Sequence, residues 1–224
     1  MSRTLPKRPP RVGPAAPPEA LTARMFLLAY DPAKGRLAGR SKLGKVLRSA
    51  ALIDLQLRGN LADDDGRAKL TKAAAPKDEV LAGVLTEIRT TGPRKWRTWV
   101  DRRQRQIVRD VRDDLARTQL IKVERYRILG LIPADRITIR HPLVRRQLLQ
   151  STTDILRPSR LVTRVDLRDA SLAVLASTAD LRTIIPKELQ RRHKDRLAQL
   201  AVRVGPVIPA LKKSIQANAA AAAG

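Results

Sequence analysis

A row of arginines in the middle of the chain could bind an anion such as a phosphate. If residues 96–120 form one helix, four arginines fall within about 80° of one another on its surface. They are Arg102, Arg105, Arg109 and Arg112. Guanidinium groups form charge-assisted hydrogen bonds with phosphate oxygens, so this row is a candidate binding site. The plainer interpretation is a solvated helix face, and spacing alone does not separate the two.

A further candidate, Arg48, lies in the most apolar helix that the sequence predicts. From Lys42 onward, apolar residues recur at three- and four-residue steps and widen into an arc around most of the cylinder, which predicts a central helix. Arg48 falls at the border of this arc, so we expect its guanidinium at the edge of buried surface, half desolvated. Asp54 lies inside the arc, where it is expected to pair with Arg58 or to cap a neighbouring helix.

The composition favours a polyanionic partner. The chain has 224 residues with 46 Lys and Arg against 21 Asp and Glu, a formal net charge of +25 at pH 7. This excess predicts binding to nucleic acid or to an anionic membrane surface. The chain has no cysteine, which excludes disulfides and thiolate metal sites. No apolar run is long enough for a transmembrane helix or a signal peptide, so we expect a cytoplasmic protein.

Residues that would indicate catalysis are missing from the sequence. His141 and His193 are isolated, and the glycines of GRLAGRSKLG match neither a Walker loop nor a dinucleotide-binding fingerprint. Asp63, Asp64 and Asp65 lack the further spaced oxygen ligands of a calcium loop, and Asp-Asp-Asp-Gly is more typical of a hairpin turn. We therefore expect no enzyme, no metal site and no cofactor.

The remaining patterns predict a mainly α fold, with a single compact helical domain at 21–205. A basic, proline-rich tail is expected at 1–20 and a second tail at 206–224. Two small β-hairpins are expected, one around Asp-Asp-Asp-Gly and one at 122–140. The other helices are expected from Asp78 to the Gly92-Pro93 stop, Trp96 to Leu120, Leu143 to Leu156, Val165 to Leu181 and Lys187 to Val204.

The hairpin at 122–140 is expected to project with an apolar tip. Leu129, Leu131 and Ile132 lie where turns usually have polar side chains. Such a tip could pack against the body of the protein, contact a second subunit or insert into a membrane. The basic residues flanking it would suit contact with lipid head groups; they are Arg125, Arg127, Arg136 and Arg140.

Five motifs, in this order along the chain, resemble the Golgi phosphoprotein 3 family of peripheral membrane proteins, which recognise phosphatidylinositol 4-phosphate. The motifs are MFLLAYDPAKGRL, LRSAALIDLQLRG, APKDEVLAGVL, VRDVRDDL and LASTADL, and the resemblance covers roughly Leu21 to Val204. It implies a mostly helical domain with a flat basic face, a lipid-phosphate pocket on that face, and a hairpin that reaches the membrane or a neighbouring subunit.

The same resemblance implies which residues form the pocket. The family uses one arginine of the central helix and two arginines three positions apart in a later helix, which correspond to Arg48, Arg109 and Arg112. An aromatic residue nine positions before the first arginine completes the family pocket, but this chain has Gly39 there. We therefore expect binding of acidic lipids in general rather than strict selectivity for phosphatidylinositol 4-phosphate. Two basic residues near Gly39 could bind the head group by charge in place of the stacking that an aromatic ring provides; they are Arg40 and Lys42.

The resemblance also implies location and partners. The expected location is the cytosolic face of a membrane, which is the Golgi in a eukaryote or the inner membrane in a bacterium. Further implied partners are cytosolic tails of membrane enzymes and a homo-oligomer formed through the hairpin. The alternative is a nucleic-acid-binding protein that uses the same basic surface, which the net charge alone favours. The sequence lacks interleaved aromatic residues for base stacking and a helix-turn-helix or zinc-finger pattern, which disfavours this alternative.

Overall fold

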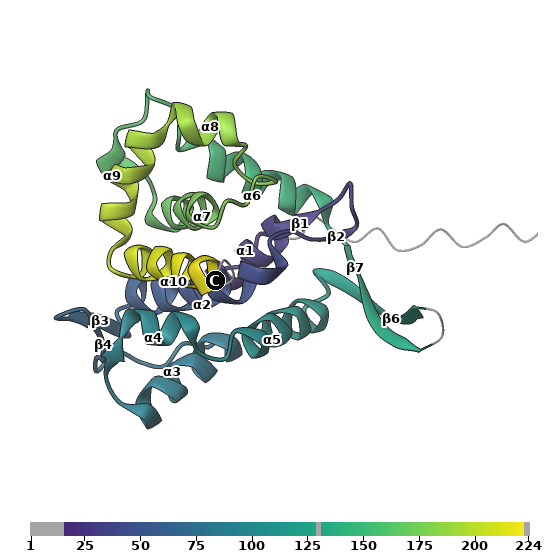
Figure 1. Ribbon diagram of the computed structural model, residues 1–224, viewed down its shortest axis with the longest axis horizontal. Coiled ribbons are helices and arrows are strands. Elements are labelled where there is room, and N and C mark those ends of the chain that lie inside the picture. The colour runs from purple at the N-terminus through teal and green to yellow at the C-terminus, as the bar shows by residue number, and fades with distance from the viewer. Residues whose placement is uncertain (1–15, 129–130, 222–224) are drawn as a thin grey trace, which may run out of the picture.

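The computed structural model describes residues 16–128 and 131–221, which form a helical body with one projecting β-hairpin (Figure 1). The helices of the first half are α1 (Leu21–Ala29), α2 (Arg40–Leu57), α3 (Glu79–Thr91), α4 (Trp96–Asp101) and α5 (Gln104–Arg117). Those of the second half are α6 (Pro142–Asp154), the 3-10 helix η1 (Val162–Arg164), α7 (Leu167–Thr178), α8 (Lys187–Arg192), α9 (Lys194–Val204) and α10 (Val207–Ala221). The predicted mainly α fold is confirmed.

Helix α2 is the central helix of this body, as its sequence predicts. Every residue from Leu43 to Leu55 is buried, and α2 contacts α1, α3, α4, α5, α7 and α10. In Figure 1, α3, α4 and α5 lie on one side of α2, and α6 to α9 lie on the other. Each fully buried leucine, isoleucine or valine stabilises the fold by about 1.5–3 kcal/mol. The packing of both halves therefore depends on α2.

Local sequence signals determine several element ends. Asp78 caps α3 by accepting a hydrogen bond of 2.8 Å from the backbone N–H of Leu81. Strands β3 (Leu61–Asp64) and β4 (Arg67–Leu70) form the first predicted hairpin, and both turn residues, Asp65 and Gly66, have positive φ. That conformation is typical of Asp-Gly in two-residue hairpin turns. Three short strands were not predicted: β1 (Tyr30–Asp31), its partner β2 (Arg36–Leu37), and β5 (Arg94–Lys95), which pairs with β4.

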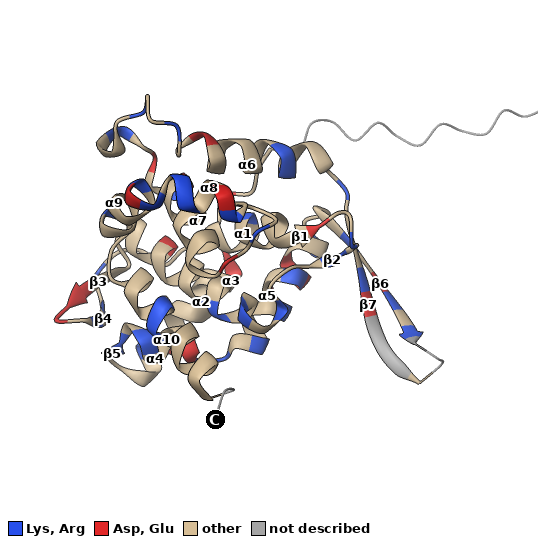
Figure 2. Ribbon diagram, turned by 45° about the horizontal axis from the view of Figure 1, so that its top comes forward, with Lys and Arg blue, Asp and Glu red and all other residues tan. Residues whose placement is uncertain are grey.

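The second predicted hairpin consists of β6 (Ile121–Ile128) and β7 (Ile132–Ile139). The strands pair antiparallel, from Ile121 opposite Ile139 to Ile128 opposite Ile132. Apolar residues near its base pack against the core, namely Ile121, Val123, Ile137 and Ile139. The strands then extend away from the helical body (Figures 1 and 2).

Two helices that were expected to be continuous are divided. The helix expected from Trp96 to Leu120 is interrupted at Arg102 and Arg103, and Arg103 adopts a left-handed conformation with φ of 46°. The helix expected from Lys187 to Val204 is divided at His193 into α8 and α9. Neither interruption contains glycine or proline, so tertiary contacts must compensate for them.

The C-terminal segment also differs from the expected tail at 206–224. Helix α10 packs on the body through Val207, Ile208, Ala210, Leu211 and Ser214. The Nζ of Lys45, a residue only 1% exposed, donates to the carbonyl oxygen of Ser214 at 2.8 Å and lies 3.2 Å from Asp101 Oδ1. The helical domain therefore continues past residue 205. Residues 1–15 and 222–224 of the expected tails lie outside the described residues.

Candidate functional site

Arg48 is a buried member of an ion-pair cluster. It is 2% exposed, its Nη1 lies 3.0 Å from Glu87 Oε2, and its Nε donates to the carbonyl oxygen of Trp99 at 3.1 Å. Burial lowers the pKa of Arg48, and the charge of Glu87 acts in the opposite direction. The prediction of a half-desolvated guanidinium is therefore wrong, because the side chain is almost fully enclosed.

The interruption between α4 and α5 separates the arginine row. Arg102 turns toward α3, where its Nε lies 2.5 Å from Glu87 Oε1. Arg105 and Arg109 are exposed residues on α5. Arg112 pairs with Asp113 at 2.8 Å and with Asp135 of β7. The four arginines therefore do not form one continuous surface.

A hollow between α2 and the first half of α5 brings together three arginines with no carboxylate among its lining residues. Arg40 comes from the first turn of α2, and Arg105 and Arg109 come from α5. Within the described part of the chain, none of these three side chains has an ion-pair partner. The volume of this basic hollow is about 790 Å³, and its other lining residues are Leu37, Ser41, Leu43, Gly44, Gln104 and Val108. Free guanidinium groups beside an apolar wall suit an anion that also carries a non-polar part.

Gly44 allows α5 to approach α2 closely enough to form the basic hollow. A Cβ at this position would lie 2.5 Å from the backbone carbonyl oxygen of Gln104, the first residue of α5. A side chain at position 44 would therefore move the start of α5. Arg105 and Arg109 follow Gln104 on the same helix, so their position depends on this glycine.

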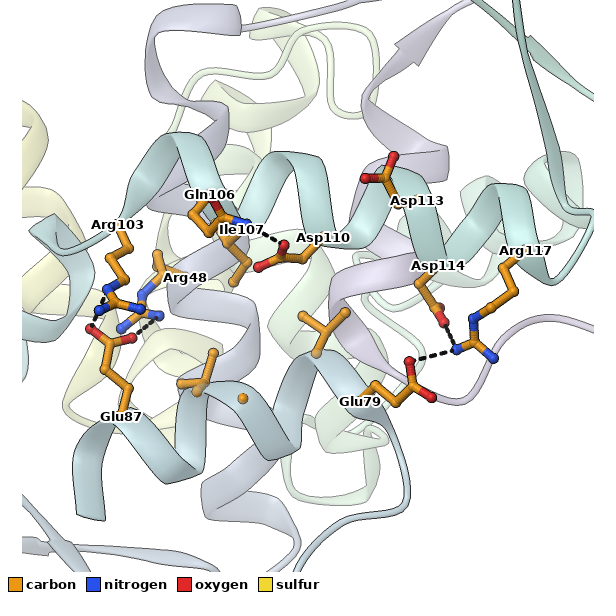
Figure 3. Close-up of a pocket in the computed structure, with 13 residues that line it drawn as sticks. Arg48, Glu79, Glu87, Arg103, Gln106, Ile107, Asp110, Asp113, Asp114 and Arg117 are labelled. Atoms are coloured by element: carbon orange, nitrogen blue, oxygen red, sulfur yellow. Dashed lines mark hydrogen bonds and ion pairs between the residues drawn. The ribbon is translucent and has the colours of Figure 1, made fainter. Parts of the chain in front are cut away.

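A second cavity, of about 500 Å³, lies between α3 and α5 and is lined by charges of both signs (Figure 3). At one end of this α3–α5 cleft, Arg48 and Arg103 face Glu87. Toward the other end, Arg117 pairs with Glu79 and Asp114. The cleft also contains Asp110 and Asp113. Because these carboxylates repel a phosphate, the basic hollow is the better candidate for an anion site.

The family comparison decides the class of protein. A family model described as Golgi phosphoprotein 3 (GPP34) matches residues 21–218. The chain belongs to this family. The match extends beyond the resemblance seen in the sequence and includes most of α10, in agreement with the packing of that helix. A search of curated proteins gives no match.

The three arginines that the resemblance predicts for one pocket do not line one cavity in this chain. Arg109 lines the basic hollow, whereas Arg48 lines the α3–α5 cleft. Arg112 is not among the lining residues of either cavity. Of the two residues expected to replace the aromatic ring by charge, Arg40 lines the hollow and Lys42 does not. Arg105 belongs to the arginine row of the sequence but is not one of the predicted pocket residues.

Gly39, which the resemblance places at the position of the family aromatic residue, has a backbone that disfavours a larger side chain. It precedes α2 in a left-handed conformation with φ of 60°, and no side chain caps the helix there. A Cβ on Gly39 would lie 2.5 Å from Cδ2 of Leu181. An aromatic residue would therefore require both a strained backbone and a displaced Leu181 side chain.

The tip of the projecting hairpin is exposed where the structure describes it. Leu131 is 83% exposed, so this residue does not pack against the body. Leu129 and the side chain of Ile132 lie outside the described residues. The ion pair between Arg112 and Asp135 connects the hairpin to α5, the helix that also carries the arginines of the basic hollow. Among the helices that the structure describes, none has the length and hydropathy needed to span a bilayer.

Proposed function

We propose that this member of the Golgi phosphoprotein 3 family is a peripheral membrane protein that binds anionic phospholipid head groups, including phosphatidylinositol 4-phosphate, in the basic hollow. The observation that carries the proposal is the set of three arginines, Arg40, Arg105 and Arg109, that share one hollow without a carboxylate. Family membership and the net charge of +25 support it.

In this proposal the three guanidinium groups bind phosphate oxygens directly. Each charge-assisted hydrogen bond contributes about 1.5–3 kcal/mol. Leu37, Leu43 and Val108 provide an apolar wall that can contact the C–H groups of the inositol ring. Helix α2 begins at Arg40, so the positive end of its dipole lies at the hollow and adds to the attraction of the phosphate.

We further propose that the hairpin tip inserts into the bilayer once the hollow has bound a head group. The exposure of Leu131 supports this step, because an apolar side chain in water gains free energy on entering the membrane interface. Arg125, Arg127 and Arg136 are exposed on the same hairpin and could contact neighbouring head groups. Following the family role, we propose location on the cytosolic face of a membrane, with cytosolic tails of membrane enzymes as protein partners.

The structure gives less support to nucleic-acid binding by the same surface. Three aromatic residues that could stack on bases are buried in the core, namely Phe26, Trp96 and Trp99. Tyr126 is 46% exposed, but it lies on the hairpin beneath the guanidinium of Arg136, whose carbon is 5.7 Å from the ring centroid. The described residues therefore do not form a row of exposed aromatic side chains.

A flotation experiment tests the proposed function. Phosphatidylcholine vesicles with and without phosphatidylinositol 4-phosphate are mixed with the protein, in the presence and absence of excess duplex DNA. We expect the protein to float only with the anionic vesicles, and DNA to compete weakly. Equal flotation with neutral vesicles, or complete displacement by DNA at physiological salt, would contradict the proposal.

A further inference from the structure

The carboxylate of Glu87 lies among three guanidinium groups. Its Oε2 is 3.0 Å from Arg48 Nη1, and its Oε1 is 2.5 Å from Arg102 Nε and 3.7 Å from Arg103 Nε. The Glu87 side chain is only 8% exposed, although it lines the α3–α5 cleft together with Arg48 and Arg103. Figure 3 shows Glu87 pointing from α3 toward Arg48 and Arg103.

The backbone around this cluster is built to bring the arginines to Glu87. Arg102 and Arg103 occupy the interruption between α4 and α5, and Arg103 has the left-handed φ of 46° that is uncommon outside glycine. This interruption directs two consecutive arginine side chains toward one carboxylate. A continuous helix would place consecutive residues about 100° apart on its surface.

The cluster has more positive than negative charge. Three arginines face one glutamate, so part of their positive charge is not compensated. The Nη2 of Arg48 is buried and has no hydrogen-bond partner among the described residues. A buried donor without an acceptor costs free energy, so this group favours an additional oxygen ligand.

We infer that Glu87 occupies an anion site formed by Arg48, Arg102 and Arg103, and that its carboxylate keeps an external phosphate out of this site. A carboxylate and a phosphate accept the same N–H bonds from guanidinium groups, so one can replace the other. The α3–α5 cleft gives access from solvent to this position. Glu87 is therefore a specificity-determining residue that restricts head-group phosphate to the basic hollow.

This inference explains why Arg48, which corresponds to a pocket arginine of the family, is not free in this chain. Its partner comes from α3, a helix that does not line the basic hollow. The inference goes beyond the proposed function because it concerns a different cavity. It also predicts a gain of phosphate binding when the carboxylate of Glu87 is neutralised.

The variant Glu87→Gln tests this inference with inorganic phosphate as the probe. Glutamine has nearly the same shape as glutamate but leaves the three arginines without an anion. We expect the melting temperature of this variant to rise more in sodium phosphate, relative to sodium chloride of equal ionic strength, than that of the wild type, in which only the basic hollow is open to phosphate. In calorimetric titration, the variant should bind phosphate about tenfold or more tightly than the wild type.

Two further variants serve as controls. Asp64→Asn removes one negative charge from an exposed residue of β3 and so changes the net charge as Glu87→Gln does, but its response to phosphate should remain that of the wild type. In Glu87→Gln/Arg48→Met the buried guanidinium is removed, and the additional response of Glu87→Gln should be lost although the protein folds in chloride. If Glu87→Gln alone does not fold in chloride, we expect phosphate to restore its folding.

The inference is overturned if phosphate raises the melting temperature of Glu87→Gln no more than that of the wild type or of Asp64→Asn. It is also overturned if Glu87→Gln folds in neither salt. A full response in the double variant would also overturn it, because Arg48 would then not belong to the site.

Vesicles containing phosphatidylinositol 4-phosphate provide a separate test. If Glu87→Gln binds these vesicles more tightly than the wild type but does not bind free phosphate more tightly, only the surface charge has changed. That result would contradict the proposal that Glu87 occupies an anion site. Failure of the wild type to bind these vesicles would refute the proposed function and leave the phosphate result unaffected.

Discussion

The carboxylate of Asp54, in the last turn of α2, accepts a hydrogen bond of 2.8 Å from the backbone N–H of Leu21, the first residue of α1. Its other oxygen lies 3.0 Å from Arg58 Nε and 3.0 Å from Arg168 Nη1. The side chain is completely buried. Asp54 thus has both roles that the sequence left open, because it pairs with Arg58 and caps a neighbouring helix.

We predict that Asp54→Ala destabilises the fold by about 3–5 kcal/mol, because it leaves the buried N–H of Leu21 without an acceptor and removes the buried carboxylate that the half-buried Arg58 and Arg168 share. Asp54→Asn should cost less, since its amide oxygen can still accept one hydrogen bond. Urea unfolding measures both values. The control is Asp64→Ala, which breaks an exposed pair with Lys69 and should cost about 0–1 kcal/mol. If Asp54→Ala lowers the free energy of unfolding no more than Asp64→Ala does, the role assigned to Asp54 is contradicted.

Helix α10 should contribute directly to stability. Leu211 is fully buried in this helix, so Leu211→Ala should cost about 2–5 kcal/mol through lost burial and a cavity. The adjacent Lys212 is exposed, and Lys212→Ala should change stability by about 0.5 kcal/mol or less. Equal, small effects of the two substitutions in urea unfolding would indicate that this segment is not part of the folded domain.

Much of the fold follows from local sequence patterns. Asp78 and the Gly92-Pro93 stop predicted the ends of α3, and the Asp65-Gly66 turn predicted the first hairpin. Helix α10 also had a local signal, because Val207, Ile208 and Leu211 follow helical spacing. The alanine-rich end that follows them led instead to the expectation of a tail.

The candidate site was less predictable, because long-range contacts determine it. The interruption at Arg102 and Arg103 has no local signal, and these arginines meet Glu87 only after α3 packs against α5. The burial of Arg48 depends on the same carboxylate. Arg105, Arg109 and Arg112 of the predicted row lie on α5, whereas Arg102 lies in the interruption before it. Only the arrangement of α2 and α5 shows that Arg40, Arg105 and Arg109 share one hollow.

The capping residue Asp78 should make stability depend on pH. Burial raises its pKa, and the charges of Asp114 and Asp54 add to this effect, although the N–H of Leu81 opposes it. A carboxyl group whose pKa is higher in the folded than in the unfolded state contributes stability below the unfolded pKa of about 3.9. That contribution is lost as the pH rises through the folded pKa.

In Asp78→Asn the side-chain oxygen can still cap α3, but the amide group cannot ionise. We therefore expect the free energy of unfolding of Asp78→Asn, minus that of the wild type, to be larger at pH 7 than at pH 3. Urea unfolding of both proteins at the two pH values measures this difference. A relative stability that is constant, or more favourable at pH 3, would contradict the assigned direction of the pKa shift.

The exposed hairpin tip distinguishes membrane insertion from subunit contact. If the tip inserts, Leu131→Asp should weaken vesicle binding at least about tenfold without changing the sedimentation mass. Val202→Asp is a matched control, because Val202 is 82% exposed on α9 and lies outside the hairpin. A smaller sedimenting mass with unchanged vesicle binding would assign the tip to assembly instead.

The most direct test of head-group binding in the basic hollow is the affinity of Arg109→Ala for vesicles that contain phosphatidylinositol 4-phosphate. The matched control is Arg89→Ala, which removes the same charge from an exposed position on α3 outside the hollow. Loss of one charge-assisted interaction should weaken binding by Arg109→Ala about tenfold or more, while Arg89→Ala stays close to the wild type. Equal affinities of the two variants would contradict the proposed site.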